Sequence, residues 1–239
     1  MNDALHFSYK GFFDHLVDAI SFHTSSKDAE KFIVKNRNAR SSIVASMFAL
    51  ESAANCLLNS LDLNRKLNDE LDRLTLLAKF DVFLKWSGFE TLNRGRAEVQ
   101  SIMEVVRARN DYVHPKVMKL EAKLSPKDSN KDCISFSVMT NTRPSTKISK
   151  CPMYWSDIDC LAVLKVTVDF LSYLVEEVMS LAPQEAHKVF SSRIQESDIH
   201  IMLLHPELKN ELTIAAKDLG ISFEFLGVDK SYFIQGLDG

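Results

Sequence analysis

Ten residues near the middle of the chain, RARNDYVHPK at positions 107–116, combine side chains suited to chemistry on a phosphate. The imidazole of His114 can accept or donate a proton near neutral pH. A guanidinium, from Arg107 or Arg109, can hold a phosphate oxygen and stabilise the negative charge that develops in a transition state. The amide of Asn110 can orient either group. These residue types indicate phosphodiester chemistry that needs no metal ligand.

The spacing of apolar residues predicts that this stretch closes a helix over residues 96–113. Arg109 lies at intervals of three and four from the apolar stripe Val99, Ile102, Val106 and Val113. A guanidinium on such a stripe must reach solvent or find a partner, because burying it unpaired costs several kcal/mol. Glu51 and Glu104 are the two partners that we consider.

Pro115 disfavours helical geometry at His114, so we expect the helix to end there. The histidine then stands at the helix C-terminus, where the helix dipole favours its cationic form. Two roles are open for its imidazole: proton transfer to a substrate, or hydrogen bonding to the last carbonyls of the helix. With Arg107 as position i, Asn110 is at i+3 and His114 is at i+7, so the three side chains share one face of the helix.

Long apolar stripes and few helix breakers predict a mainly α-helical fold. The 239 residues are 46% apolar and include seven glycines and six prolines. We expect a first helix over residues 8–23 and a second that begins at a cap at Ser25 or Ser26 and contains an apolar stripe from Ile43 to Leu61. A third helix is expected over 70–87, with Gly88 as its C-cap, and a fourth over 96–113. The last long helix is expected to begin at Ser156 or Asp157 and to end at Pro183. The 70–87 helix is apolar nearly all round, so part of its surface is expected to meet a partner.

Two segments depart from the helical pattern. Within residues 125–153, apolar and polar residues alternate from Ile134 to Val138, before the turn-like sequence NTRPS. This predicts a hairpin at about 133–150, inserted between helices, or else a mobile loop. Residues 184–239 predict a strand-helix-strand tail, with its helix from Pro206 to Gly220.

This pattern divides the chain into a helical part, residues 1–183, and a small α/β appendage, residues 184–239. Two strands alone are marginally stable. The strands of the tail are therefore expected to pair with the inserted hairpin or to lie on the bundle.

Charge and cysteine content restrict the class of protein. The net charge is -3, so an anionic partner must be met by a local basic patch. The four cysteines, Cys56, Cys133, Cys151 and Cys160, contain no C-x-x-C pair, which predicts free thiols in a reducing compartment. The sequence shows neither a signal peptide nor a run of about 18 apolar residues. We therefore expect a soluble, cytoplasmic protein.

The motif R-N-x-x-x-H at a helix end resembles the signature of the HEPN superfamily (higher eukaryotes and prokaryotes nucleotide-binding). The family motif is an arginine, a polar residue directly after it, and a histidine after four to six intervening residues. Arg109, Asn110 and His114 match it here, and Arg107 with His114 fits the longest spacing. Either arginine can therefore take the motif role.

Two further segments resemble helices of the same family and occur in the family's order. Glu51 and Asn55, in the segment FALESAANCLL, match the glutamate and asparagine of one family helix. Lys79 and Phe80, in LLAKFDVFLKW, match the lysine and the aromatic residue of another. The resemblance covers roughly residues 28–180. From its residue type alone, Lys79 is expected to reach solvent along an apolar surface.

The resemblance implies an up-and-down bundle of four or five helices, commonly dimeric. In active members two motifs face each other across the dimer and cleave RNA with no metal or other cofactor. The ribose 2′-hydroxyl attacks, leaving a cyclic phosphate. Arg109 would bind the phosphate, His114 would transfer the proton and Asn110 would orient them. The residues assigned to supporting roles are Arg107, Glu51 and Asp111.

The expected partners follow from the same resemblance. Active members are often toxins or abortive-infection effectors, which implies RNA, a second copy of the chain, and an antitoxin or other protein. Other members are non-catalytic interaction or nucleotide-binding modules, and this is the alternative function. Many toxin-type members carry a tyrosine two residues after the histidine, where this chain has Lys116.

Overall fold

The structure is a computed structural model that describes residues 6–61, 63–124, 136–196 and 199–228. The predicted loop at 125–132, the strand residue Ile134 and the end of the tail lie outside the described residues. Within the described ranges the chain forms eight α-helices and five short strands. The prediction of a mainly α-helical bundle with a small β part is confirmed.

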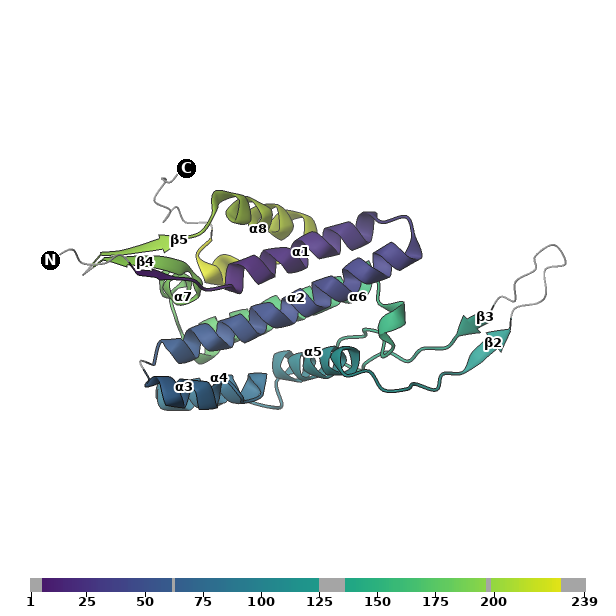
Figure 1. Ribbon diagram of the computed structural model, residues 1–239, viewed down its shortest axis with the longest axis horizontal. Helices are drawn as coiled ribbons and strands as arrows, with labels where there is room; N and C mark the ends of the chain where they lie inside the picture. Colours follow the sequence, from purple (N-terminus) through teal and green to yellow (C-terminus); the bar gives the residue numbers. More distant parts are fainter. Residues whose placement is uncertain (1–5, 62, 125–135, 197–198, 229–239) are drawn as a thin grey trace.

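Three helices run side by side and form the centre of the bundle (Figure 1). They are α1 (Phe12–Asp28), α2 (Phe32–Asn59) and α6 (Asp157–Ser172), and α6 continues as a π-helix, η2 (Tyr173–Val178). On the side of α2 away from α1, α4 (Leu76–Trp86) packs against α2, and α5 (Ala97–Val113) packs against α2 and α6. The short α3 (Arg65–Leu71) precedes α4.

The central position of α2 follows from its sequence. The predicted stripe is buried along the helix, at Ile43, Met47, Leu50, Ala54 and Leu57. Within the described part of the chain, α2 is the one helix long and apolar enough to cross a membrane by length and composition, and 67% of its apolar window is buried inside the protein. Such burial is what the core helix of a soluble protein has, so the fold is compatible with the predicted solubility.

Several predicted helix boundaries are wrong. Residues 6–8 form a strand, so α1 begins at Phe12, and it extends to Asp28. Ser25 and Ser26 therefore lie inside α1 and cap nothing; the Ser26 hydroxyl instead donates to the Lys35 carbonyl at 2.8 Å. Pro183 does not end the last long helix, because it begins a separate helix, α7 (Pro183–Phe190).

The helix predicted over 70–87 is two helices with a turn between them. Asn64 caps α3 by accepting from the Leu67 N–H at 3.1 Å, and Thr75 precedes α4 in extended geometry. Gly88 ends α4 as predicted, with a φ of +82° that favours glycine. Leu76, Phe80, Phe83 and Leu84 of α4 are buried, whereas Trp86 at its end is 62% exposed. The predicted partner surface on this helix stays a prediction.

The tail forms a sheet with the N-terminal segment rather than with the inserted hairpin. Strand β4 (Ser192–Glu196) lies between β1 (His6–Ser8) and β5 (Ile199–Leu203), and all pairs are antiparallel. Helix α8 (Pro206–Leu219) follows and ends at Gly220, close to the prediction. The predicted last strand is instead a short 3-10 helix, η3 (Glu224–Leu226), because neighbouring Phe225 and Leu226 are both buried and do not alternate.

Tail and bundle share one hydrophobic core. Phe190 of α7 is fully buried, and its ring centroid lies 4.8 Å from that of Phe12 in α1. Leu212 of α8 and Leu226 of η3 belong to the same buried cluster. The predicted division at residue 183 stays a prediction, but the residues on its two sides pack together.

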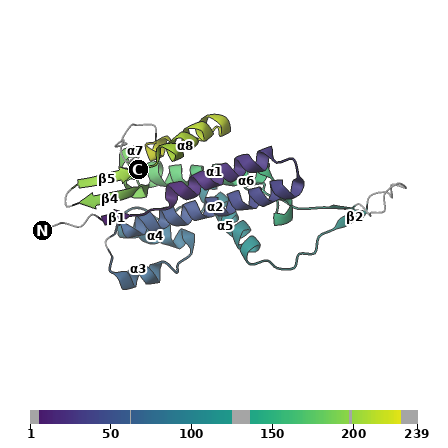
Figure 2. The ribbon, with the colours of Figure 1, turned by 45° about the horizontal axis from the view of Figure 1, so that its top comes forward.

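A hairpin projects from the end of the bundle (Figures 1 and 2). Its strands are β2 (Ala122–Leu124) and β3 (Phe136–Val138), paired antiparallel. The strand predicted near Val138 is thus present, but its partner lies upstream and not within 133–150. The chain then makes a separate turn, closed by a bridge between Thr142 and Ser149.

The shared core predicts the effect of Phe190→Ala. Removing this buried ring should destabilise the protein by about 3–5 kcal/mol, because a cavity remains between the tail and α1. Urea unfolding, followed by circular dichroism and tryptophan fluorescence, should show one transition shifted to lower urea. Ile214→Ala, at a half-exposed site on α8, is the control and should change stability by less than about 0.5 kcal/mol. Two separate transitions in wild type would contradict a shared core.

Candidate functional site at the end of α5

Helix α5 buries one face and leaves the motif side chains outside it. Val99, Ile102, Val105 and Ala108 are fully buried. The inner stripe is therefore shifted from the predicted one, and Val113 is 44% exposed. Arg109 lies at the edge of the packed face and is half-buried.

Arg109 makes a single polar contact within the described residues. One of its terminal nitrogens, Nη1, donates to the Asn110 side-chain oxygen at 3.1 Å, while its buried Nε has no hydrogen-bond partner there. Neither predicted partner pairs with it. Glu51 lies 3.4 Å from the ammonium of Lys79, and Glu104 accepts bonds from a turn. The predicted ion pair of Arg109 is therefore wrong.

His114 ends α5 as Pro115 predicts. Its backbone N–H donates to the Asn110 carbonyl at 2.9 Å, and its φ and ψ of −118° and 68° have left the helical region. The imidazole is exposed and forms no hydrogen bond or ion pair within the described part of the chain. The alternative role, imidazole capping of the last carbonyls, is not observed.

The remaining motif residues differ in their surroundings. Arg107 and Asn110 are exposed on the outer side of α5, so the structure keeps both accessible along with His114. Asp111 instead accepts from Arg143 at 2.6 Å, and that arginine is almost buried. Asp111 therefore holds a neighbouring turn, while Arg107, Arg109, Asn110 and His114 gather at the helix end.

The turn at residues 143–149 is fixed to α5 by a buried carboxylate. Glu104 accepts from the backbone N–H groups of Ser145 and Thr146 at 3.1 and 2.9 Å, and from the Thr146 hydroxyl at 3.0 Å. Burial raises the pKa of Glu104, but these hydrogen bonds outweigh burial, so the pKa lies below its usual value. The carboxylate stays ionised and holds the turn against the helix.

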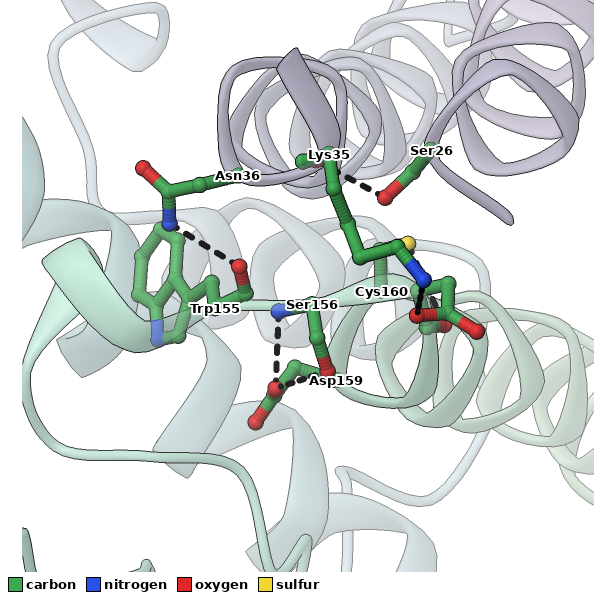
Figure 3. Close-up of polar contacts among 8 residues, drawn as sticks. Ser26, Lys35, Asn36, Trp155, Ser156, Asp159 and Cys160 are labelled. Carbon is green, nitrogen blue, oxygen red and sulfur yellow. Dashed lines mark hydrogen bonds and ion pairs between the residues drawn. The ribbon is translucent and has the colours of Figure 1, made fainter. Parts of the chain in front are cut away.

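The same turn is tied to the start of α6. Trp155 donates from its indole Nε1 to the Ser149 carbonyl at 2.8 Å, and Asp159 accepts from the Ser149 N–H at 2.8 Å. Figure 3 shows this helix start, where Ser156 and Asp159 form the predicted cap and Asn36 of α2 donates to the Trp155 carbonyl. The indole of Trp155 also packs against the Tyr112 ring of α5, with centroids 5.6 Å apart.

Tyr112 lines a groove beside the motif. The groove has a volume of about 410 Å³ and runs between α1 and α2; Phe22, Val44, Ala45 and Phe48 supply its apolar surface. The guanidinium of Arg40 lies 5.7 Å from the centroid of the Tyr112 ring. Sequence reasoning did not find this groove, because its walls come from three separate helices.

A second polar cluster lies far from the motif. Lys79 is 3% exposed, and its ammonium is held by Asn55 at 2.9 Å, Asp72 at 2.7 Å and Glu51 at 3.4 Å. The expectation that Lys79 reaches solvent is therefore wrong. Arg40, beside the motif, precedes Asn55 by 15 residues on α2, which corresponds to about 22 Å along the helix axis.

A polar cavity of about 610 Å³ adjoins this second cluster. Asn55, Asn59, Asn68, Asp69 and Asp72 line it, together with residues of the β1–α1 connection. Within the described ranges, no group of three or more His, Cys, Asp or Glu side chains is arranged to hold a metal ion. The cavity offers amides and carboxylates, a lining suited to a polar ligand that is not a polyanion.

The thiols take no part in either cluster's hydrogen bonding. Cys56, Cys151 and Cys160 are free and buried, as the sequence predicts, and Cys133 lies outside the described residues. Burial raises the pKa of Cys56 to about 11 and that of Cys160 to about 12. Both remain thiols at neutral pH and do not serve as nucleophiles.

Comparisons with known proteins add no family. No protein-family model matches the chain, and neither a curated protein nor a solved structure matches it significantly.

Glu104→Gln tests the fixation of the turn. Because the pKa of Glu104 is lowered on folding, the carboxylate stabilises the fold above the ordinary glutamate pKa of 4.5, and this stability is lost as the pH falls through the lower folded value. At pH 7 the variant should lose about 1–3 kcal/mol. In urea unfolding from pH 7 to pH 3, the difference from wild type should shrink. Glu211→Gln, at an exposed site of α8, serves as control; a constant difference at all pH values would contradict the account.

Lys79→Met tests the buried ammonium. The change leaves the three acceptors without their common donor and should lower the free energy of unfolding by about 1–3 kcal/mol, since Glu51 and Asp72 remain partly solvated. Lys85→Met, at an exposed site of the same helix, should have little effect. If both variants unfold at the same urea concentration as wild type, the cluster does not stabilise the fold.

Proposed function

We propose that this protein is a metal-independent endoribonuclease that acts as a homodimer, an RNA-directed effector of the toxin or abortive-infection type. The observation that supports this most is the exposed imidazole of His114, which has no partner within the described residues, at the same helix end as the half-buried guanidinium of Arg109. Such an effector would act in the cytoplasm.

The proposed reaction assigns a role to each motif residue. His114 removes the proton from a ribose 2′-hydroxyl, and the 2′-oxygen attacks the adjacent phosphorus. Arg109 holds a non-bridging phosphate oxygen and stabilises the charge that develops there, while Asn110 orients Arg109 through their 3.1 Å contact. The bond from phosphorus to the 5′-oxygen breaks, and a protonated histidine supplies the proton to that leaving oxygen. The products are a 2′,3′-cyclic phosphate and a 5′-hydroxyl.

Arg107 and a second copy of the chain complete the proposed site. Arg107 is exposed beside the motif and supplies a second positive charge for the RNA backbone. On a chain of net charge -3, a single motif attracts a polyanion only weakly. Two motifs related by a twofold axis bring more positive charge to one place and support binding better. An antitoxin or another protein would regulate such an effector.

Membership of the HEPN superfamily is part of the proposal. Its support is the order of the three similar segments, the helical bundle, and the contacts of Lys79 with Glu51 and Asn55, which join two of those segments. Asp111 holds Arg143, and Glu51 holds Lys79. Both supporting residues therefore act on the scaffold.

The alternative is a non-catalytic interaction or nucleotide-binding module. The polar cavity of about 610 Å³ favours a binding role for a small polar ligand, because that cavity lies away from the motif and contains no motif residue. Its carboxylates suit the phosphates of a nucleotide poorly. In this alternative, Arg109 and His114 would be surface residues without a chemical role.

Cleavage of RNA in the presence of EDTA tests the proposal. Purified wild-type protein should cleave mixed RNA and leave cyclic phosphate ends. His114→Ala should reduce the rate by about 100-fold or more while retaining the urea midpoint of wild type. His6→Ala, at an exposed position of β1, is the matched control and should keep full activity. Equal cleavage by wild type and His114→Ala would remove the histidine from the reaction and favour the alternative module.

A further inference from the structure

The projecting hairpin carries apolar side chains that no described part of the chain covers. We call the described residues 116–124 and 136–140 the arm. Its exposed apolar residues are Val117, Met118, Leu120, Leu124 and Met139, and Leu124 is 75% exposed. Figures 1 and 2 show the arm pointing away from the bundle, and its two strands pack mainly on each other. A two-stranded hairpin in this state is marginally stable.

The register of the hairpin separates its two faces. Ala122 pairs with Val138 and Lys123 pairs with Ser137. Directly opposed residues share a face and neighbouring residues alternate, so one face presents Ala122, Leu124 and Val138 and the other presents Lys123 and Ser137. A ribbon with one apolar face is built to lie on another surface.

The groove beside Tyr112 is the matching surface. It is apolar and open, with Phe22 and Phe48 exposed by 37% and 42%. Its charged residues are Asp18 and Arg40, so the groove itself has no net charge and Asp18 is the one acidic residue in it that a lysine of the arm can meet. The described arm contains three lysines and one glutamate, whereas the chain as a whole is acidic, so the arm and the rest of the molecule have complementary charge.

We infer that the arm of one copy docks in the groove of a second copy, and that the exchange is reciprocal. In one chain, the apolar face of the arm and the apolar groove are both exposed and lie apart. In a dimer with a twofold axis, each arm can cover the groove of the other copy. The described arm and the groove together supply about as many residues as one side of a standard interface, roughly 20–30. The occupant of the groove is therefore a second copy of this chain.

The exchange brings the two motifs together. The arm starts two residues after His114, and the groove contains Tyr112, two residues before it. Met118 follows His114 by four residues, which span at most about 14 Å of extended chain. With Met118 in the partner's groove, His114 of the same copy lies within about 14 Å of that groove, which Tyr112 of the partner's motif lines. The inference shares a dimer with the proposed function but does not depend on catalysis.

Two matched pairs of variants test the docking. Leu124→Asp and Ser137→Asp each add one negative charge to the same hairpin, on opposite faces. Phe48→Asp changes the groove, and Phe32→Asp changes an exposed phenylalanine of the same helix outside it. Light scattering at micromolar concentration should report about twice 27.1 kDa for wild type, Ser137→Asp and Phe32→Asp. Leu124→Asp and Phe48→Asp should be monomers with the circular dichroism of wild type.

Mixing the two monomeric variants tests the pairing of arm and groove. A dimer of Leu124→Asp with Phe48→Asp retains one intact contact, so the mixture should form mixed dimers at concentrations where each variant alone is monomeric. A monomeric wild type, a dimeric Leu124→Asp, or a mixture without mixed dimers overturns the exchange. Dimers that dissociate as expected but cleave no RNA leave the exchange standing and remove the proposed function. RNA cleavage by a wild type that is monomeric throughout retains the ribonuclease activity but overturns both the exchange and the homodimer of the proposed function.

Discussion

The buried carboxylate of Glu104 holds together the end of the molecule that carries the candidate site. The chain leaves α5 at His114, makes the projecting hairpin and returns at Arg143, and the bonds from Ser145 and Thr146 to Glu104 close this long excursion at its base. The pair of Asp111 with Arg143 adds a second tie nearer the helix end. Ordering a long segment costs conformational entropy, and the hydrogen bonds to Glu104 and the pair of Asp111 with Arg143 offset part of that cost. The position of the hairpin therefore depends on these contacts.

This closure lets one helix perform two tasks. Val105 and Ala108 pack inward, whereas Arg107, Arg109, Asn110 and His114 lie outside the fully buried face and Asp111 pairs with Arg143. The guanidinium of Arg109 is half-buried and donates to Asn110, and the imidazole of His114 is exposed. A guanidinium and an accessible imidazole are the groups that phosphate chemistry requires, and this supports the proposed reaction over the alternative module.

Local patterns in the sequence predicted much of the scaffold, and long-range contacts account for most of what they missed. The stripe of α2, the end of α5 at Pro115 and the Ser156 cap depend on neighbouring residues, and all three were predicted correctly. The pairing of β1 with β4 and the ties of Glu104 join residues far apart in the chain, which periodicity does not report. For the candidate site, Pro115 correctly predicted that His114 ends the helix. The expectations that Glu51 pairs with Arg109 and that Lys79 reaches solvent are wrong, because Lys79 is held by Asn55, Asp72 and Glu51. One sequence feature indicates that Glu104 is buried. Val105 and Ala108 lie at i and i+3 on the buried face of α5, and Glu104 directly precedes Val105.

Complementation between inactive variants tests whether the two proposed motifs act together in one cleft. Arg109→Ala and His114→Ala would each be inactive as homodimers. A mixed dimer keeps an intact arginine on one copy and an intact histidine on the other. Ribonuclease activity of the two variants should be measured separately and after mixing, with the formation of mixed dimers verified by mass spectrometry. If the two motifs share a cleft, mixing restores cleavage that neither variant shows alone. Mixed dimers that form and remain inactive would contradict a shared cleft.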